Sequence, residues 1–427
     1  MRLIPENIAQ KFYPFALTAL SFSIPIHNRL TSSIVVIIGL FWLFEFNFGE
    51  KFRRVKNSKP KQYLFLFSTL FFLFLIGLIY SENMSTNESG ALFNLEKRMS
   101  FLGFPLLLAT IDIENIQERL YKQILKAFIL GCLLSSFFLV NVAFFEYLQS
   151  DNIKAFYYNE LSEFHHPSYL AMYLTFAIAI LLNWILNSEK ANPAKRNAVY
   201  LLILAFQLMI ILLSSKAGIL GTVLIYFLTI IYTIITKNLI PRIKILIPII
   251  FLISFVITLF LNPYALSRLY SAEKSIEQEN IDETEKVDGT VARVIVWKNA
   301  LEVIKENPIF GVGTGDTKQA LMKKYKEKNI STALENELNA HNEYLQTYMS
   351  VGILGFLVLV LSLFIPGWLA FRRNKMVYFL FLVLVAFHFL VESMLAKQAG
   401  IVFYAFFNVV LFLQAFGHNK NRSKFEV

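Results

Sequence analysis

The chain has 427 residues, of which 56% are hydrophobic and 43 are phenylalanine. In a soluble globular domain the apolar share is nearer to half, so this composition excludes one and indicates a chain solvated by lipid. The formal net charge of +10 would suit a nucleic-acid-binding protein, but the Lys and Arg residues gather in short segments between long apolar runs. We therefore expect the basic charge to set the orientation of the chain in the membrane, and we expect no nucleic-acid partner.

Apolar runs near the ~20 residues that a helix needs to cross a bilayer recur along the whole chain. They lack the alternation of a barrel strand, and an unpaired backbone group in hydrocarbon is costly. The pattern predicts an all-α polytopic membrane protein with about twelve transmembrane helices. The expected spans are 11–26, 30–48, 62–80, 99–111, 121–147, 167–187, 198–214, 217–236, 245–262, 346–371, 376–392 and 399–417.

The basic segments predict the orientation of these spans. They occupy the connections on one side of a twelve-span arrangement, namely 51–61, the stretch around Lys190, Lys195 and Arg196, 237–244, 372–375 and the tail after His418. By the positive-inside rule both termini are then cytoplasmic. The chain divides into nine helices over 1–262, one long external loop over 263–345, and three helices with a basic tail over 346–427.

The long loop holds the polar part of the chain. Its first part, 262–289, is acidic in its second half and is typical of a solvated segment. A helix is predicted over 293–307, followed by a glycine-rich turn at 311–316 and a polar helix at 317–328. The first helix has apolar residues at helical spacing, namely Val294, Trp297, Leu301 and Ile304, and Pro308 lies beyond its end.

Charged residues at the expected membrane boundaries are candidate functional groups, because charge at membrane depth is costly. Lys216, in LLSSKAGILG, lies where two spans meet on the outer side, and an interfacial lysine that snorkels is an equal alternative. Glu392 and Lys397 lie at another outer turn, and we expect them to pair with each other.

Two arginines of the loop are candidate anion-binding groups. Arg293 falls in the first turn of its predicted helix, where the helix dipole disfavours a cation by up to about 1 kcal/mol. A bound phosphate would offset that cost, since helix amides and a guanidinium can hold one anion together. Arg268, just after the ninth span, is a second cation at the same face, with an interfacial anchor as the alternative.

His341 is the candidate general base. It begins a helix that enters the membrane, with Asn339 as the expected cap, so the positive helix end favours its neutral imidazole. A neutral imidazole accepts a proton near neutral pH, which suits general-base catalysis. Capping or interfacial packing is the plain alternative.

Other polar groups predict little chemistry. His165 and His166 precede a span, but without nearby Cys, Asp or Glu partners they favour no metal site. Cys132 stands alone in an apolar span and is typical of a small buried hydrophobe. The turn GVGTGD at 311–316 lacks the spacing of a phosphate-binding loop, and no strand precedes it.

Together these motifs resemble the bacterial O-antigen ligase and polymerase superfamily of membrane glycosyltransferases. The ligase signature begins with His followed by Asn, Ser or Gln. After nine further residues comes Gly, and after two more comes Gly, Thr or Tyr. In this chain the four positions are His341, Asn342, Gly352 and Gly355. Upstream, 292–316 resembles the arginine-led helix and turn that precede this signature. HHPSYLAMYL at 165–174 and LLSSKAGILG at 212–221 are similar to two earlier landmarks of the family.

This resemblance implies a GT-C-like membrane enzyme that transfers a glycan from an undecaprenyl diphosphate-linked donor to a hydroxyl of an acceptor such as lipid A-core. It implies a periplasmic active site in the bacterial inner membrane, an inverting mechanism, and no metal or other cofactor. His341 would deprotonate the acceptor, and Arg293 and Arg268 would bind the diphosphate. Lys216, Asn342 and His166 would also contact substrate, although the family commonly has arginine at the position of Lys216, so the bidentate fork is lost.

Three functions remain open from the sequence. A ligase is favoured over the sibling polymerase, because only one outer loop is long and the His-Asn-Gly signature is present. A transporter or flippase is the alternative from another class. It is disfavoured because its broken helices and paired charges would lie near the midplane, whereas polar groups here gather at the outer face.

Overall fold

The computed structural model describes residues 4–57, 61–87, 90–111, 117–188, 192–236, 242–277 and 289–417. All regular elements in these ranges are helical, which confirms the all-α prediction. Parts of the predicted basic connections (58–60, 189–191, 237–241), the tail from 418 and most of the acidic segment (278–288) lie outside the described residues.

The helices follow the predicted order along the chain. The N-terminal half contains α1 (Glu6–Ser23), α2 (Asn28–Phe44), α3 (Phe48–Asn57), α4 (Lys61–Ile76), α5 (Ala91–Arg98), α6 (Ser100–Thr110), α7 (Gln117–Ser150), α8 (Tyr158–Leu161), α9 (Pro167–Asn187) and α10 (Pro193–Leu212). The C-terminal half contains α11 (Lys216–Ile235), α12 (Leu246–Phe260), α13 (Pro263–Glu277), α14 (Gly289–Glu306), α15 (Thr317–Glu327), α16 (Ser331–Glu335), α17 (Glu343–Arg372), α18 (Met376–Val391) and α19 (Gln398–Phe416). Three short 3-10 turns are η1 (Ile153–Phe156), η2 (Arg242–Ile245) and η3 (Met394–Ala396).

Each of the twelve expected spans coincides with a helix, but fewer helices are long and apolar enough to cross a bilayer. Among the described residues six qualify, and a seventh if α12 and the first part of α13, bent by 87°, count as one span. Helices α2, α4 and α18 are apolar but shorter. The structure thus supports a multi-pass membrane protein, and the number twelve stays a prediction.

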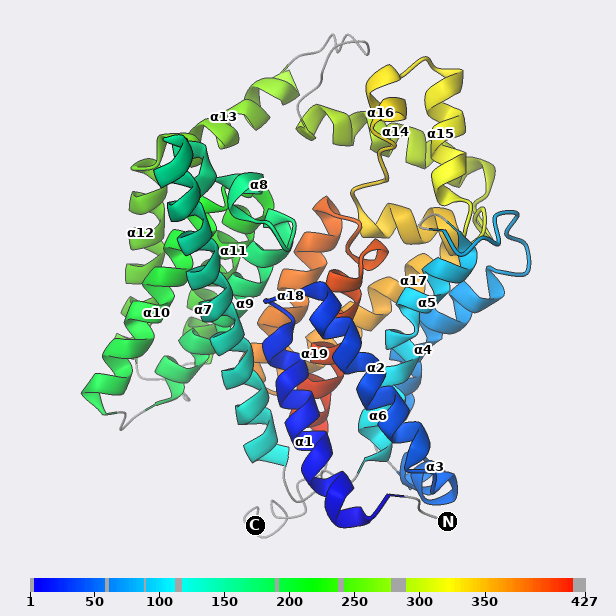
Figure 1. Ribbon diagram of the computed structural model, residues 1–427, viewed down its shortest axis with the longest axis horizontal. Helices are drawn as coiled ribbons and strands as arrows, with labels where there is room; N and C mark the ends of the chain where they lie inside the picture. The colour runs from blue at the N-terminus through cyan, green and yellow to red at the C-terminus, as the bar shows by residue number, and fades with distance from the viewer. Residues whose placement is uncertain are drawn as a thin grey trace.

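The two ends of the helical bundle differ (Figure 1). Helices α14, α15 and α16 gather at one end, whereas α1 begins and α19 ends at the opposite end. The predicted loop and the predicted cytoplasmic ends therefore lie apart, as the charge pattern requires. Which end faces the periplasm stays a prediction.

Two apolar cores hold the molecule together. The larger fills the bundle around α9, whose residues are almost all buried, and it includes Cys132 in α7. The smaller lies among α14, α15 and α16 and reaches α17 through Met349. The predicted apolar face of α14 is partly wrong: Val294 and Leu301 are 36% and 47% exposed, because the helix turns Ile295, Val296, Ala300 and Val303 into this core instead.

The glycine-rich turn after α14 packs into a break in α17. Gly352 has φ 69° and ψ −164°, a conformation that interrupts the helix and is essentially restricted to glycine. The break frees two carbonyl groups, and the turn satisfies them: Val312 N donates to Met349 O at 2.7 Å and Gly313 N donates to Ser350 O at 3.0 Å. The signature glycine Gly352 thus allows the segment that follows α14 to pack against α17.

Candidate functional site

His341 lies just before α17, in a tight turn. Its φ of 42° is in the left-handed region, which is uncommon for residues other than glycine. Its backbone N–H donates to Asn339 Oδ1 at 2.9 Å, which stabilises this turn. The helix itself begins at Glu343 and is capped by Asn342, whose Oδ1 accepts from Leu345 N. The prediction that His341 begins the helix with Asn339 as cap is therefore wrong, although Asn339 does support the histidine.

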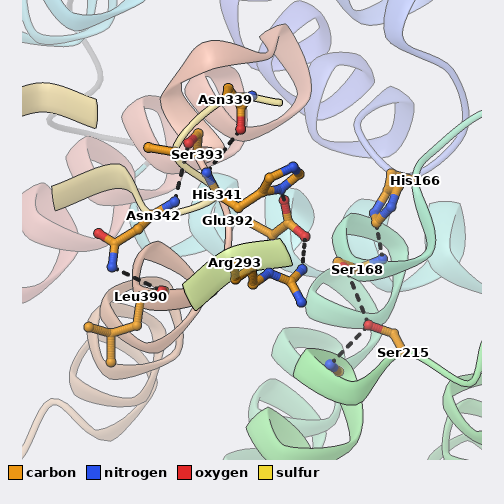
Figure 2. A network of polar contacts seen from close by, with 12 residues as sticks. His166, Ser168, Ser215, Arg293, Asn339, His341, Asn342, Leu390, Glu392 and Ser393 are labelled. Carbon is orange, nitrogen blue, oxygen red and sulfur yellow. Dashed lines mark hydrogen bonds and ion pairs between the residues drawn. The ribbon is translucent and has the colours of Figure 1, made fainter. Parts of the chain in front are cut away.

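Glu392, at the end of α18, contacts both predicted catalytic residues (Figure 2). Its Oε2 lies 3.3 Å from His341 Nδ1, and its Oε1 accepts from Arg293 Nη2 at 3.0 Å. The predicted pairing of Glu392 with Lys397 is wrong, because both carboxylate oxygens face these two groups and Lys397 is exposed. Sequence reasoning missed this role, for which the only signal was a carboxylate at the end of an apolar run.

The charge of Glu392 is maintained by its partners. Burial alone would raise the pKa of this carboxyl, but the hydrogen bond with His341 and the charges of His341, Arg293 and His166 hold the pKa below its ordinary value. An ionised carboxylate at Nδ1 favours the tautomer with its proton on Nδ1. The Nε2 lone pair of His341 is then free to accept a proton.

The turn that carries Glu392 is tied to the start of α17 by neighbouring hydrogen bonds. Asn342 N donates to Ser393 Oγ at 3.3 Å, and Asn342 Nδ2 donates to Leu390 O at 3.1 Å. Glu343, which is fully buried, accepts from Leu395 N at 2.7 Å. The Asn342 side chain thus holds the turn through Nδ2 and caps α17 through Oδ1, and its predicted contact with substrate stays a prediction.

The prediction that Arg293 lies in the first turn of its helix is wrong, because α14 begins at Gly289. We expected an anion to bind this guanidinium, and the Glu392 carboxylate of the protein itself is one such anion. This contact uses one of the five N–H donors of the guanidinium. Within the described part of the chain, the buried Nε of Arg293 has no hydrogen-bond partner, so donor capacity is left for a ligand.

His166 lies across from the Glu392 group, at the start of α9. Its Nδ1 accepts from Ser168 N at 3.3 Å, so the ring caps the helix (Figure 2). The surrounding protein atoms desolvate the imidazole and lower the pKa of His166, while the charge of Glu392 opposes this shift. The charges of His341, Arg293 and Arg268 also act on this ring, so the four predicted groups share one region.

Lys216 begins α11 beside this region. The preceding Ser215 caps the helix by accepting from Gly218 N, and its hydroxyl donates to Ser168 Oγ at 3.2 Å. The two landmark motifs at 165–174 and 212–221 therefore meet at the starts of α9 and α11. The structure thus brings the chain at Lys216 next to the helix that His166 caps.

His165 points elsewhere. It is 5% exposed and contacts the Tyr173 ring in the larger core, and burial lowers the pKa of its imidazole to about 4. Among the described residues, no three His, Cys, Asp or Glu side chains gather as metal ligands would. Metal-independent chemistry stays a prediction.

Part of the chain is similar to known proteins. Residues 199–360 match the family model described as O-antigen ligase, and this confirms the resemblance to the O-antigen ligase superfamily. The fold is that of a multi-pass membrane protein, and its residues 199–360 are similar to these ligases. Among individual proteins, one from Haemophilus influenzae whose function is uncharacterized is 26% identical over 365 residues, covering 82% of this chain and 84% of that protein. The matched range contains Lys216, Arg268, Arg293 and His341, but neither His166 nor Glu392.

Proposed function

We propose that this protein is an O-antigen ligase-like glycosyltransferase that moves a glycan from an undecaprenyl diphosphate carrier to a hydroxyl of lipid A-core or a similar acceptor. The observation that carries the proposal is the Glu392 carboxylate, which contacts His341 at 3.3 Å and Arg293 at 3.0 Å. One buried anion thereby orients a base and an anion-binding group toward the same place. The match to the O-antigen ligase family supports this reading.

In the proposed reaction His341 acts as general base. Its Nε2 takes the proton of the acceptor hydroxyl as the oxygen forms a bond to the anomeric carbon of the donor sugar. The bond from that carbon to the phosphate oxygen breaks, and the lipid diphosphate leaves with both electrons. Attack from the face opposite the leaving group inverts the anomeric configuration. Glu392 stabilises the imidazolium that forms, as the carboxylate of a catalytic triad does.

Arg293 and Arg268 neutralise the charge that develops on the departing diphosphate. Arg293 offers the buried Nε that has no partner within the described chain. Lys216, at the start of α11, adds a point charge from the opposite side, without the fork of an arginine. His166, with its lowered pKa, contributes a neutral ring to the wall that faces the carrier.

The proposed location is the bacterial inner membrane, with the site on the periplasmic side and the termini in the cytoplasm. The separation of the α14–α16 end from the end where the termini lie supports this orientation (Figure 1). A lipid-linked donor would then reach the site from the outer leaflet, where nucleotide donors are absent.

A deletion strain tests the function. Lipopolysaccharide run on a gel should show only core bands if the protein is a ligase, whereas core bearing a single repeat would identify the sibling polymerase. An unchanged pattern of surface glycans would contradict both.

Two variants test the site. His341→Ala and Arg293→Ala should each abolish transfer while the amount of protein in the membrane stays normal. Glu337→Gln, an exposed glutamate of the same loop that pairs with Lys318, is the matched control and should transfer normally. Activity above about a tenth of wild type in either site variant would refute the assigned role, because a general base contributes about 10²- to 10⁴-fold. Loss of activity on adding a chelator would contradict the metal-free mechanism.

A further inference from the structure

A turn with two tyrosines lies against the face of α13 that carries Arg268. The Tyr158 ring lies beneath the Arg268 guanidinium, whose central carbon is 3.4 Å from the ring centroid. One residue earlier, the Tyr157 ring contacts the Tyr264 ring, with centroids 4.6 Å apart and planes at 32°. Tyr264 and Arg268 are four residues apart and so share one face of the helix. The turn therefore contacts α13 at two successive helical turns.

These contacts matter because α13 does not continue the helix before it. It leaves α12 at an angle of 87°, so the membrane helix alone does not fix which face of α13 points toward the site. The two aromatic contacts select the face with Tyr264 and Arg268. The placement of Arg268 thus depends on residues 157 and 158, which are far from it in the sequence.

Tyr158 is also held in an unusual backbone conformation. Its φ is 54°, which is a genuine outlier for a bulky side chain and costs free energy that its surroundings must offset. Besides Arg268, its ring contacts the His166 ring edge-on, with centroids 6.4 Å apart and planes at 80°. The ring therefore lies between two of the groups assigned to the donor site.

We propose that Tyr158 is a positioning residue for the lipid-linked diphosphate donor and acts through Arg268. The tyrosine ring stacks on the flat face of the guanidinium, while the N–H donors lie in the plane and point outward from its edge. Stacking and phosphate binding therefore use different parts of the same group and can coexist. The inference rests on the proposed function, since it concerns the same donor.

The test compares donor kinetics of purified variants with a prenyl diphosphate-linked glycan as substrate. Tyr158→Ala should raise the donor KM by about 5- to 30-fold, the range of a partly desolvated cation–π contact, with little change in kcat. Tyr158→Phe keeps the ring and should stay within about twofold of wild type. The matched control is Tyr270→Ala on the same helix, where the side chain is 52% exposed, and it should leave KM unchanged.

A double-mutant cycle separates positioning from a general structural role. If Tyr158 acts through Arg268, the double variant Arg268→Ala with Tyr158→Ala should match Arg268→Ala alone. Additive losses, or a Phe variant as impaired as the Ala variant, would overturn the proposal. Should Tyr158→Ala fail to accumulate, Tyr158→Leu keeps apolar bulk without the π face and should show the same rise in KM.

A binding measurement distinguishes failure of this inference from failure of the proposed function. Farnesyl diphosphate, a short prenyl diphosphate that needs no acceptor, should bind wild type more tightly than Tyr158→Ala or Arg268→Ala. Equal binding by all three would overturn the role of Tyr158 while the ligase proposal stands. Normal transfer by His341→Ala and Arg293→Ala would refute the proposed function, whatever the binding result.

Discussion

Replacing Glu392 with glutamine is the sharpest test of the site. The side chain keeps its size but exchanges one acceptor oxygen for an NH₂ donor. Two donors converge on the carboxylate, His341 Nδ1 at 3.3 Å and Arg293 Nη2 at 3.0 Å, so an amide can satisfy only one of them. If His341 faces the NH₂ group, its proton moves to Nε2 and the base is lost.

The expected loss in Glu392→Gln is therefore that of a general base in the wrong tautomer. This amounts to about 10²- to 10⁴-fold in kcat, or about 3 to 5 kcal/mol of activation free energy. The donor KM should change little, because the arginines keep their charges. The assay is glycan transfer between detergent-solubilised lipids at saturating donor. A variant within about tenfold of wild type in kcat would show that Glu392 does not orient the base.

Two further predictions concern stability. Folding lowers the pKa of Glu392 below its ordinary value of 4.5, so the contribution of this carboxylate to stability is complete above that pH and is lost as the pH falls through the folded value. Below about pH 4.5, wild type should therefore lose thermal stability more steeply than Glu392→Gln. Melting curves in detergent that depend on pH in the same way for both proteins would contradict this. Gly352→Ala should lower the free energy of unfolding by at least about 3 kcal/mol, since its Cβ would overlap the Ile309 carbonyl oxygen at φ 69°. The control Gly39→Ala, with open space around it, should melt like wild type.

The sequence was sufficient to predict the helical ranges, whereas the roles of the candidate site residues stay predictions. Apolar runs near bilayer length predict helices, because in lipid the backbone N–H and C=O groups can be hydrogen-bonded only within the segment itself. Arg293 and His341 were selected because each was expected at the start of a helix, and the structure places both helix starts at other residues, Gly289 and Glu343. Neither argument gives the number of spans, since several apolar helices here are shorter than a bilayer requires.

The parts that could not be predicted depend on contacts between distant segments. Glu392 was expected to pair with Lys397, which is close to it in the sequence. The fold instead brings it into contact with His341, which is 51 residues away in the chain. The sequence did not indicate a role for Tyr158, because an aromatic residue before a span is common. Its contact with Arg268 depends on the 87° bend between α12 and α13, which places Arg268 over the Tyr158 ring. Pairings of this kind follow from helix packing, which a periodic pattern does not specify.

The position of Glu392 has a consequence for how the protein matures. Arg293 and His341 are synthesised before α18, but the carboxylate that contacts both follows this helix. The cluster is therefore incomplete until α18 has packed and placed Glu392 beside the other two residues. A chain that inserted α18 the wrong way round would leave Glu392 at the opposite surface. The contacts of Glu392 with Arg293 and His341 therefore also depend on the correct orientation of α18.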